Sequence, residues 1–222
     1  MRLLPGHAYV TLTPAGTAEE PAGLLGPVDR AAGRLLARAQ SPGVRRAANR
    51  LGFLGDGYVT LPPALVIGFL AGRRRRTLRP VVTIAAATAA AIVLSETTKA
   101  VTGLTRPRNW EAAVNYTGTE PLHRRIFAWT VGSFPSGHTV MATAVFGVTA
   151  RMVRRHLGPG PATTAAEAAA AAAIATCAAS RLALGVHWLS DIVGGVVVGE
   201  AAVRAVLAVE RRLPRGRAGR RQ

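Results

Sequence analysis

The sequence alternates long apolar segments with short arginine-rich ones. A helix needs roughly 17–25 apolar residues to cross a bilayer, and each apolar segment approaches or reaches that length. The five segments lie near residues 57–72, 80–98, 134–151, 162–182 and 190–209. We therefore predict an all-α fold, a polytopic membrane helix bundle of about five spans. A soluble all-α bundle is the alternative, because the first segment contains Pro62 and Pro63 and the fourth contains Glu167.

The chain before the first apolar segment is more polar. In residues 28–50, Val28 and Leu35 fall on one side of a helix and several arginines fall on another. Such a stretch is too polar to span a bilayer, so we predict an amphipathic helix at the membrane interface, interrupted at 41–43. The chain then divides into an irregular N-terminal segment, an amphipathic interfacial helix, a membrane domain and a basic cytoplasmic tail: residues 1–27, 28–56, 57–209 and 210–222.

The net charge is +17, and clusters of arginine follow alternate apolar segments. The clusters lie at residues 73–79, 151–155 and 211–221. If each apolar segment crosses the membrane, all three share one side, which the positive-inside rule assigns to the cytoplasm. The arginines of residues 38–50 do not follow this rule, so either their helix lies in the interface or the first predicted span is wrong. Nucleic-acid binding is disfavoured, because the arginines flank apolar segments and few aromatic side chains are available for base stacking.

The segment from Ser180 to Asp191 carries polar side chains in apolar surroundings. His187 and Asp191 are four residues apart, so a helical turn places them on one face. A carboxylate there can hold one imidazole nitrogen and leave the other free to act as a nucleophile, with Arg181 nearby. The pair could instead be half of a metal site, but neither an HExxH nor a CxxC motif is present, so we predict no metal and no cofactor.

Two further polar segments precede it. Lys99 and Arg106 are seven residues apart, about two helical turns, and can bind one anion from a single face. Ser136 and Gly137 come at the start of an apolar segment, where the N–H groups of a helix N-terminus attract an anion. His138 is then placed to protonate a leaving oxygen. Taken alone, this sequence could equally be an N-cap serine. Lys99 is the single lysine of the chain, and Asp29, Asp56 and Asp191 are its three aspartates.

Together these segments match the patterns KxxxxxxRP, PSGH and SRxxxxxHxxxD, in that order. In this they resemble the type 2 phosphatidic acid phosphatase superfamily (PAP2), which also contains vanadium haloperoxidases. The resemblance covers about residues 57–209. It implies a helical bundle, often of six spans, in which the amphipathic helix here would replace the first. It also implies that His187 is the nucleophile that forms a phosphohistidine, that Asp191 orients it and that His138 protonates the leaving group. The residues that would bind the phosphoryl group are Lys99, Arg106, Ser136, Gly137 and Arg181.

The expected protein is an integral membrane phosphatase that hydrolyses a lipid phosphate or a polyprenyl (di)phosphate without a divalent metal. It would resemble bacterial undecaprenyl-diphosphatases and phosphatidate phosphatases. It would lie in the plasma membrane, with its active site facing away from the cytoplasm. Its partners would be a lipid phosphate and membrane lipids, with no nucleic acid. The alternatives are a vanadium-dependent haloperoxidase-like enzyme and a non-catalytic lipid-phosphate-binding protein. We assign the choice of lipid to residues 108–133 and to lipid-facing helix surfaces; the sequence carries no signal of oligomeric state.

Overall fold

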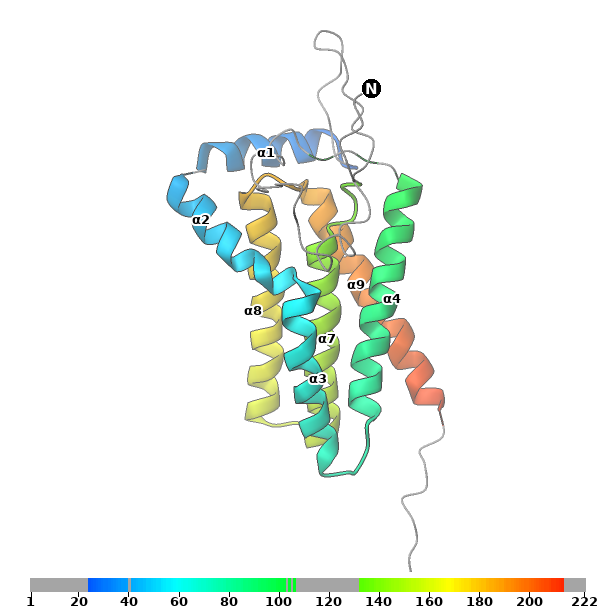
Figure 1. The fold of residues 1–222 in the computed structure, drawn as a ribbon. Helices are drawn as coiled ribbons and strands as arrows, with labels where there is room; N and C mark the ends of the chain where they lie inside the picture. Colours follow the sequence, from blue (N-terminus) through cyan, green and yellow to red (C-terminus); the bar gives the residue numbers. More distant parts are fainter. Residues whose placement is uncertain (1–23, 40, 103, 105, 107–131, 214–222) are drawn as a thin grey trace, which may run out of the picture.

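The computed structural model describes residues 24–39, 41–102, 104, 106 and 132–213. Within these ranges the chain forms seven α-helices, one short 3₁₀ helix (η1) and no strand, which confirms the predicted all-α bundle (Figure 1). The elements are α1 (Pro27–Ala39), α2 (Pro42–Leu51), η1 (Gly52–Gly55), α3 (Gly57–Arg73), α4 (Arg79–Thr102), α7 (Gly137–Leu157), α8 (Pro161–Ala183) and α9 (Leu189–Arg212). Five of these helices coincide, to within a few residues at each end, with the five predicted apolar segments.

Helix α7 is the central element of the bundle and packs against α3, α4, α8 and α9. Its side chains from Thr139 to Val145 are all buried. Two glycines of α9, Gly195 and Gly199, lie directly against Thr139 and Thr143 of α7, where an added Cβ would come within 2.7 Å of each threonine Cβ. Small residues at such crossings allow membrane helices to approach closely.

Three helices are long and apolar enough to cross a membrane, namely α4, α8 and α9. The segment Pro42–Gly55 and α3 pass the same test as a pair bent by 49°, and would form a fourth, broken span. Helix α7 does not pass, because its second half carries Arg151, Arg154 and Arg155. Since its neighbours surround α7, it does not need a wholly apolar surface. Length and composition thus support three or four of the five predicted spans.

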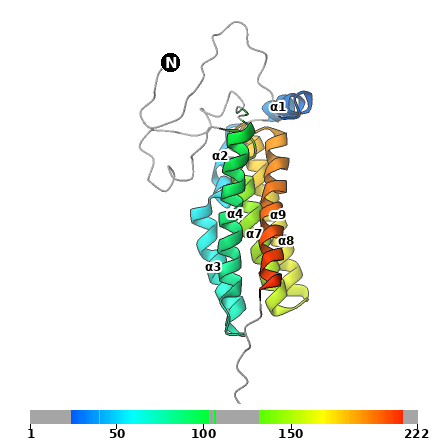
Figure 2. The ribbon, with the colours of Figure 1, turned by 90° about the vertical axis from the view of Figure 1, so that its right-hand side faces the viewer.

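The predicted amphipathic helix is divided in two. The first part, α1, ends at Ala39, and Ser41 caps the second, where its hydroxyl accepts a hydrogen bond from the N–H of Val44 (3.2 Å). Helix α1 lies across one end of the bundle, above α8 and α9 (Figure 2). Helix α2 instead descends beside α8 to meet α3 (Figure 1). The second half of the predicted interfacial helix therefore leads into the bundle.

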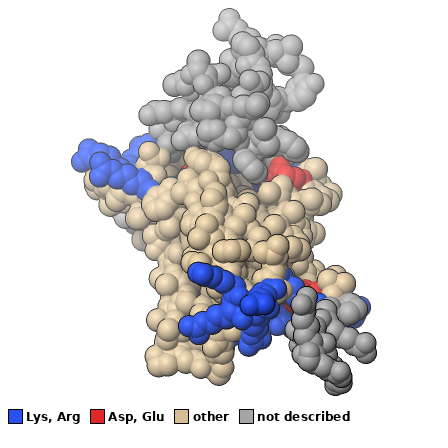
Figure 3. All heavy atoms as spheres, turned by 60° about the horizontal axis from the view of Figure 1, so that its bottom comes forward, with Lys and Arg blue, Asp and Glu red and all other residues tan. Residues whose placement is uncertain are grey.

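The opposite end of the bundle is strongly basic. It contains the connection from α3 to α4 and the last turns of α7 and α9, and Figure 3 shows arginine side chains gathered on it. Glu210 of α9 pairs with Arg79 (3.6 Å) and Arg155. These ion pairs connect α4, α7 and α9 at this end.

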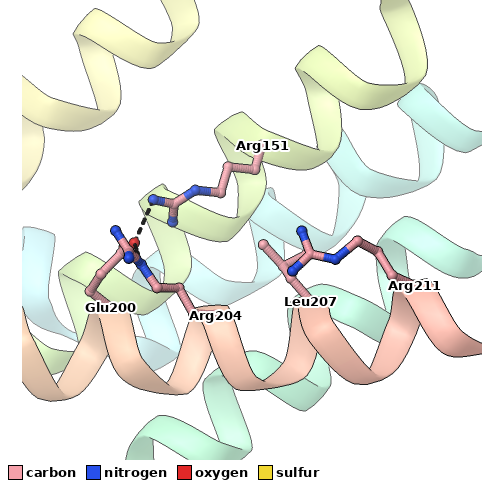
Figure 4. A pocket seen from close by; sticks show the side chains of 5 residues that line it. All are labelled: Arg151, Glu200, Arg204, Leu207 and Arg211. Carbon is pink, nitrogen blue, oxygen red and sulfur yellow. Dashed lines mark hydrogen bonds and ion pairs between the residues drawn. The ribbon is translucent and has the colours of Figure 1, made fainter.

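A shallow pocket lies on the same part of the surface. Glu200 accepts hydrogen bonds from Arg151 of α7 (2.8 Å) and Arg204 of its own helix (2.6 Å). Leu207 and Arg211 complete the lining, and in Figure 4 the guanidinium of Arg211 extends back over Leu207. Glu200 therefore offsets part of the positive charge where α7 crosses α9.

Candidate active site

The candidate site contains a buried pair formed by His187 and Asp191. His187 lies in the connection between α8 and α9, and Asp191 lies in the first turn of α9. The Nδ1 atom of His187 is 3.1 Å from a carboxylate oxygen of Asp191, and the two side chains are 2% and 0% exposed. Because Nδ1 donates to the carboxylate, Nε2 keeps its lone pair. The predicted i, i+4 relationship therefore gives an oriented imidazole.

The Asp191 side chain is held by groups from two segments, the residues before α9 and the residues before α7. It accepts hydrogen bonds from the backbone N–H of Trp188 (2.8 Å), as a helix-capping carboxylate does, and from the hydroxyl of Ser133. Its own carbonyl accepts from the N–H of Ser136 (2.9 Å). Asp191 thus connects the start of α9 to the segment that precedes α7.

Cationic side chains surround the free nitrogen of His187. Arg106 Nη1 lies 3.4 Å from His187 Nε2. Lys99, near the end of α4, is buried and pairs with Glu96 (2.6 Å), and a Cβ added to Gly137 would lie 3.2 Å from its ammonium nitrogen. The buried guanidinium of Arg181 lies on a third side, on the last turn of α8.

These cations act on the ionisation of His187. Burial lowers its pKa well below 6.5, and Arg106, His138, Arg181 and Lys99 lower it further by charge repulsion. His187 is consequently neutral at neutral pH, which is the protonation state required of a nitrogen nucleophile.

The PSGH segment begins α7. Ser136 occupies the N-cap position and is fully buried, but its hydroxyl makes no cap and instead accepts from Thr139 (3.1 Å). The first N–H groups of α7 therefore have no side-chain acceptor from this cap. The side chain of His138 is 37% exposed, far more than that of His187. Its Nε2 atom lies 3.2 Å from Asp56 Oδ1.

All eight predicted site residues lie together at one end of the bundle. They come from the end of α4, residue 106, the start of α7, the end of α8 and the start of α9. Pro107 of the first motif and most of the 108–133 segment, to which we assigned the choice of lipid, lie outside the described residues. No group of three or more His, Cys, Asp or Glu side chains able to hold a metal occurs in the part of the chain that the structure describes.

Three residues at the site were missed by sequence reasoning. Ser133 contacts Asp191, and Asp56 contacts His138. Asp29 of α1 is 1% exposed and accepts hydrogen bonds from both the N–H and the hydroxyl of Ser190. The scarcity of aspartate was the available signal, since all three aspartates of the chain lie at this end of the bundle.

Comparison with known proteins agrees with this architecture. The PAP2 superfamily matches residues 80–215. One solved structure, described as the crystal structure of the first transmembrane PAP2 type phosphatidylglycerolphosphate phosphatase from Bacillus subtilis, is 22% identical with a TM-score of 0.68, over 87% of this chain and 89% of that chain. At this identity the likeness shows a shared fold. The search of curated proteins found no match. The family match spans more than half of the sequence and includes all three motifs, and the chain belongs to the PAP2 superfamily.

Proposed function

We propose that the protein is an integral membrane phosphatase that removes a phosphoryl group from a lipid phosphate or a polyprenyl (di)phosphate. The observation that carries this proposal is the buried His187–Asp191 pair, whose second ring nitrogen, Nε2, lies 3.4 Å from Arg106 Nη1. A neutral nucleophile surrounded by fixed cations suits a dianionic phosphate ester, because the same cations that attract the phosphate keep the imidazole unprotonated.

In the first step of the proposed reaction, Nε2 of His187 attacks phosphorus. A P–N bond forms, the P–O bond to the lipid breaks, and His138 gives a proton to the departing oxygen. Lys99, Arg106, Arg181 and the N-terminus of α7 stabilise the charge on the phosphoryl oxygens. In the second step, water gives its proton to His138 and attacks phosphorus, the P–N bond breaks, and inorganic phosphate leaves. Asp191 stabilises the imidazolium character of His187 between the two steps.

The membrane helices and the charge distribution support a location and an orientation. Three or four candidate spans favour a lipid-borne substrate. The arginine-rich end of the bundle lies opposite the candidate site, and the positive-inside rule assigns such an end to the cytoplasm. We therefore place the protein in the plasma membrane with its site facing out. The Bacillus subtilis protein is described as a phosphatidylglycerolphosphate phosphatase, so that lipid belongs among the substrates to be tested.

The proposal is tested with the purified full-length protein, excess chelator and a panel of substrates. The panel contains phosphatidate, phosphatidylglycerol phosphate and an isoprenoid diphosphate. We expect phosphate release from at least one of them with the chelator present, and none from His187→Ala. Labelled substrate followed by acid quench and by base quench should reveal an acid-labile, base-stable phosphoenzyme. Substrate binding without turnover or a phosphoenzyme would instead indicate a non-catalytic binder, and loss of turnover on chelation would refute the metal-free mechanism.

A further inference from the structure

The chain carries a second aspartate–histidine pair, formed by Asp56 and His138. Asp56 stands between η1 and α3, at the bend in the broken span, and its Oδ1 atom lies 3.2 Å from His138 Nε2. Residue 56 precedes the region that matches the family, which begins at residue 80. None of the three motifs therefore assigns a role to this carboxylate.

The conformation of Asp56 leaves its carboxylate available. It occupies the N-cap position of α3, where an aspartate side chain ordinarily accepts the free N–H groups of the first turn. Here the side chain makes no such cap. The backbone carbonyl of Asp56 accepts instead from the N–H groups of Val59 (2.9 Å) and Thr60 (3.0 Å) and from the Thr60 hydroxyl (3.1 Å). The backbone is thus fixed by α3, while the carboxylate contacts His138 through Oδ1 and accepts a hydrogen bond from the Tyr58 hydroxyl at Oδ2 (3.3 Å).

The 3₁₀ turn that precedes Asp56, η1, packs directly against His138 and Arg181. A Cβ on Gly55 would lie 2.5 Å from the Cβ of His138 and 2.8 Å from its backbone, and a Cβ on Gly52 would overlap the guanidinium of Arg181. Both glycines are buried. At Gly55 only a residue without a side chain fits, because the added Cβ meets the backbone of His138, whereas at Gly52 it meets the end of the Arg181 side chain. The turn therefore holds Asp56 close to His138.

We propose that Asp56 is a positioning residue for His138 in the proton-transfer steps of the proposed phosphatase. Its carboxylate accepts the Nε2–H of His138 and leaves Nδ1 as the nitrogen that exchanges a proton with the lipid oxygen and later with water. When His138 is protonated, the carboxylate of Asp56 offsets its positive charge, which the nearby cation Arg181 disfavours. The two site histidines are thus held by opposite nitrogens: His187 through Nδ1 and His138 through Nε2.

The inference rests on the proposed function, and its signature is a dependence on the leaving group. An aliphatic lipid alcohol is a poor leaving group and needs a proton, whereas p-nitrophenolate is stable without one. A well-placed general acid contributes about 100- to 10,000-fold. For Asp56→Asn we expect kcat/KM on the lipid phosphate, which reports the step in which the leaving group departs, to fall by about tenfold to 100-fold, a fraction of that contribution. The kcat/KM on p-nitrophenyl phosphate should fall much less.

The experiment compares Asp56→Asn, Asp56→Glu, His138→Gln and the double variant Asp56→Asn/His138→Gln on both substrates, with thermal unfolding of each protein. Glu167→Gln is the matched control, because Glu167 also pairs with a cationic side chain (Arg154, 2.7 Å) but at the other end of the bundle. We expect the double variant to be no slower than His138→Gln alone, and Asp56→Glu to recover part of the loss. The control should match the wild type.

Several outcomes would overturn the inference. Equal losses on the two substrates, additive losses in the double variant, or a lower unfolding temperature that accounts for the lost activity would make Asp56 a structural residue. If kcat/KM on the lipid phosphate is unchanged in Asp56→Asn, Asp56 has no role in proton transfer by His138. Failure of the proposed function is seen separately, in the wild type: if it hydrolyses neither substrate, the phosphatase proposal falls before any variant is compared.

Discussion

Ser190 donates both its backbone N–H (2.8 Å) and its hydroxyl (2.7 Å) to the buried carboxylate of Asp29. The two residues are 161 positions apart. Ser190 stands between Trp188 and Asp191, so the contact fixes α1 to the turn that presents His187. Trp188 is itself buried beneath α1, where a Cβ on Gly33 would contact its ring at 3.9 Å. A helix outside the three motifs therefore holds the segment of the proposed nucleophile, His187, in place.

Substitution Asp29→Ala should lower the stability of this end of the bundle. It leaves the N–H and hydroxyl of Ser190 without their buried acceptor, a loss of about 1–3 kcal/mol. Thermal unfolding in detergent and the fraction of protein that forms a phosphoenzyme would measure the effect. Asp29→Asn, which keeps one acceptor oxygen, should be affected less. An unchanged unfolding temperature in Asp29→Ala would show that α1 does not support the site.

Substitution Asp191→Asn should slow phosphoenzyme formation with little effect on substrate affinity. The amide keeps an oxygen but loses the charge that fixes the tautomer of His187 and stabilises its cationic form. By analogy with an aspartate that orients a catalytic histidine, we expect a fall of about 100- to 10,000-fold. Single-turnover measurement separates this step from phosphate release. A variant that forms phosphoenzyme at the wild-type rate would refute the orienting role.

The activity should extend to acid pH. His187 attacks in its neutral form, and burial together with the nearby cations holds its pKa well below 6.5. As pH rises through that pKa the neutral fraction increases, so the acid limb of kcat/KM should lie well below pH 6.5, with no further gain from this residue above it. Arg106→Gln removes a cation facing His187 and should move the limb toward higher pH.

The pH experiment needs substrates whose phosphate groups ionise differently. A limb that belongs to His187 stays at the same pH with each substrate, whereas a limb caused by substrate ionisation moves. An enzyme limb at or above pH 6.5 would contradict the depressed pKa.

Substitution Gly55→Ala should impair both stability and turnover. The added Cβ would meet the backbone of His138 at 2.8 Å, and neither element can move without displacing the site. Overpacking of this kind costs about 1–3 kcal/mol. Gly160→Ala is the matched control, since nothing lies within 4 Å of its added Cβ and its φ of 171° is extended. Wild-type stability and kcat in Gly55→Ala would show that the 3₁₀ turn is not tightly packed.

The parts of this protein that were predictable are those encoded locally. Apolar runs indicated five helices, and the spacing of His187 and Asp191 indicated a shared face, because helical periodicity acts over a few residues. The apolar first half of α7 was sufficient to predict this helix, although its second half is polar. The motifs indicated which groups meet, although not how they contact one another.

The contacts of Asp29 and Asp56 could not be predicted in the same way. Each aspartate meets its partner through tertiary packing, and no periodicity connects residue 29 to 190 or residue 56 to 138. The bend at Asp56 was also hidden, because Gly52 and Gly55 are explained by close approach to other helices and not by a local turn signal. An interfacial helix was expected to account for the arginines of residues 38–50, but α2 descends beside α8 to meet α3.

The bend at Asp56 lies outside the region that matches the family, yet it contributes a carboxylate to the candidate site. A protein fragment that began at residue 80 would retain every motif and every cation around His187, yet it would lack the carboxylate beside His138 and the helix over Trp188. The motifs alone therefore indicate the proposed nucleophile, His187, but do not indicate the carboxylate that contacts the proposed proton donor, His138.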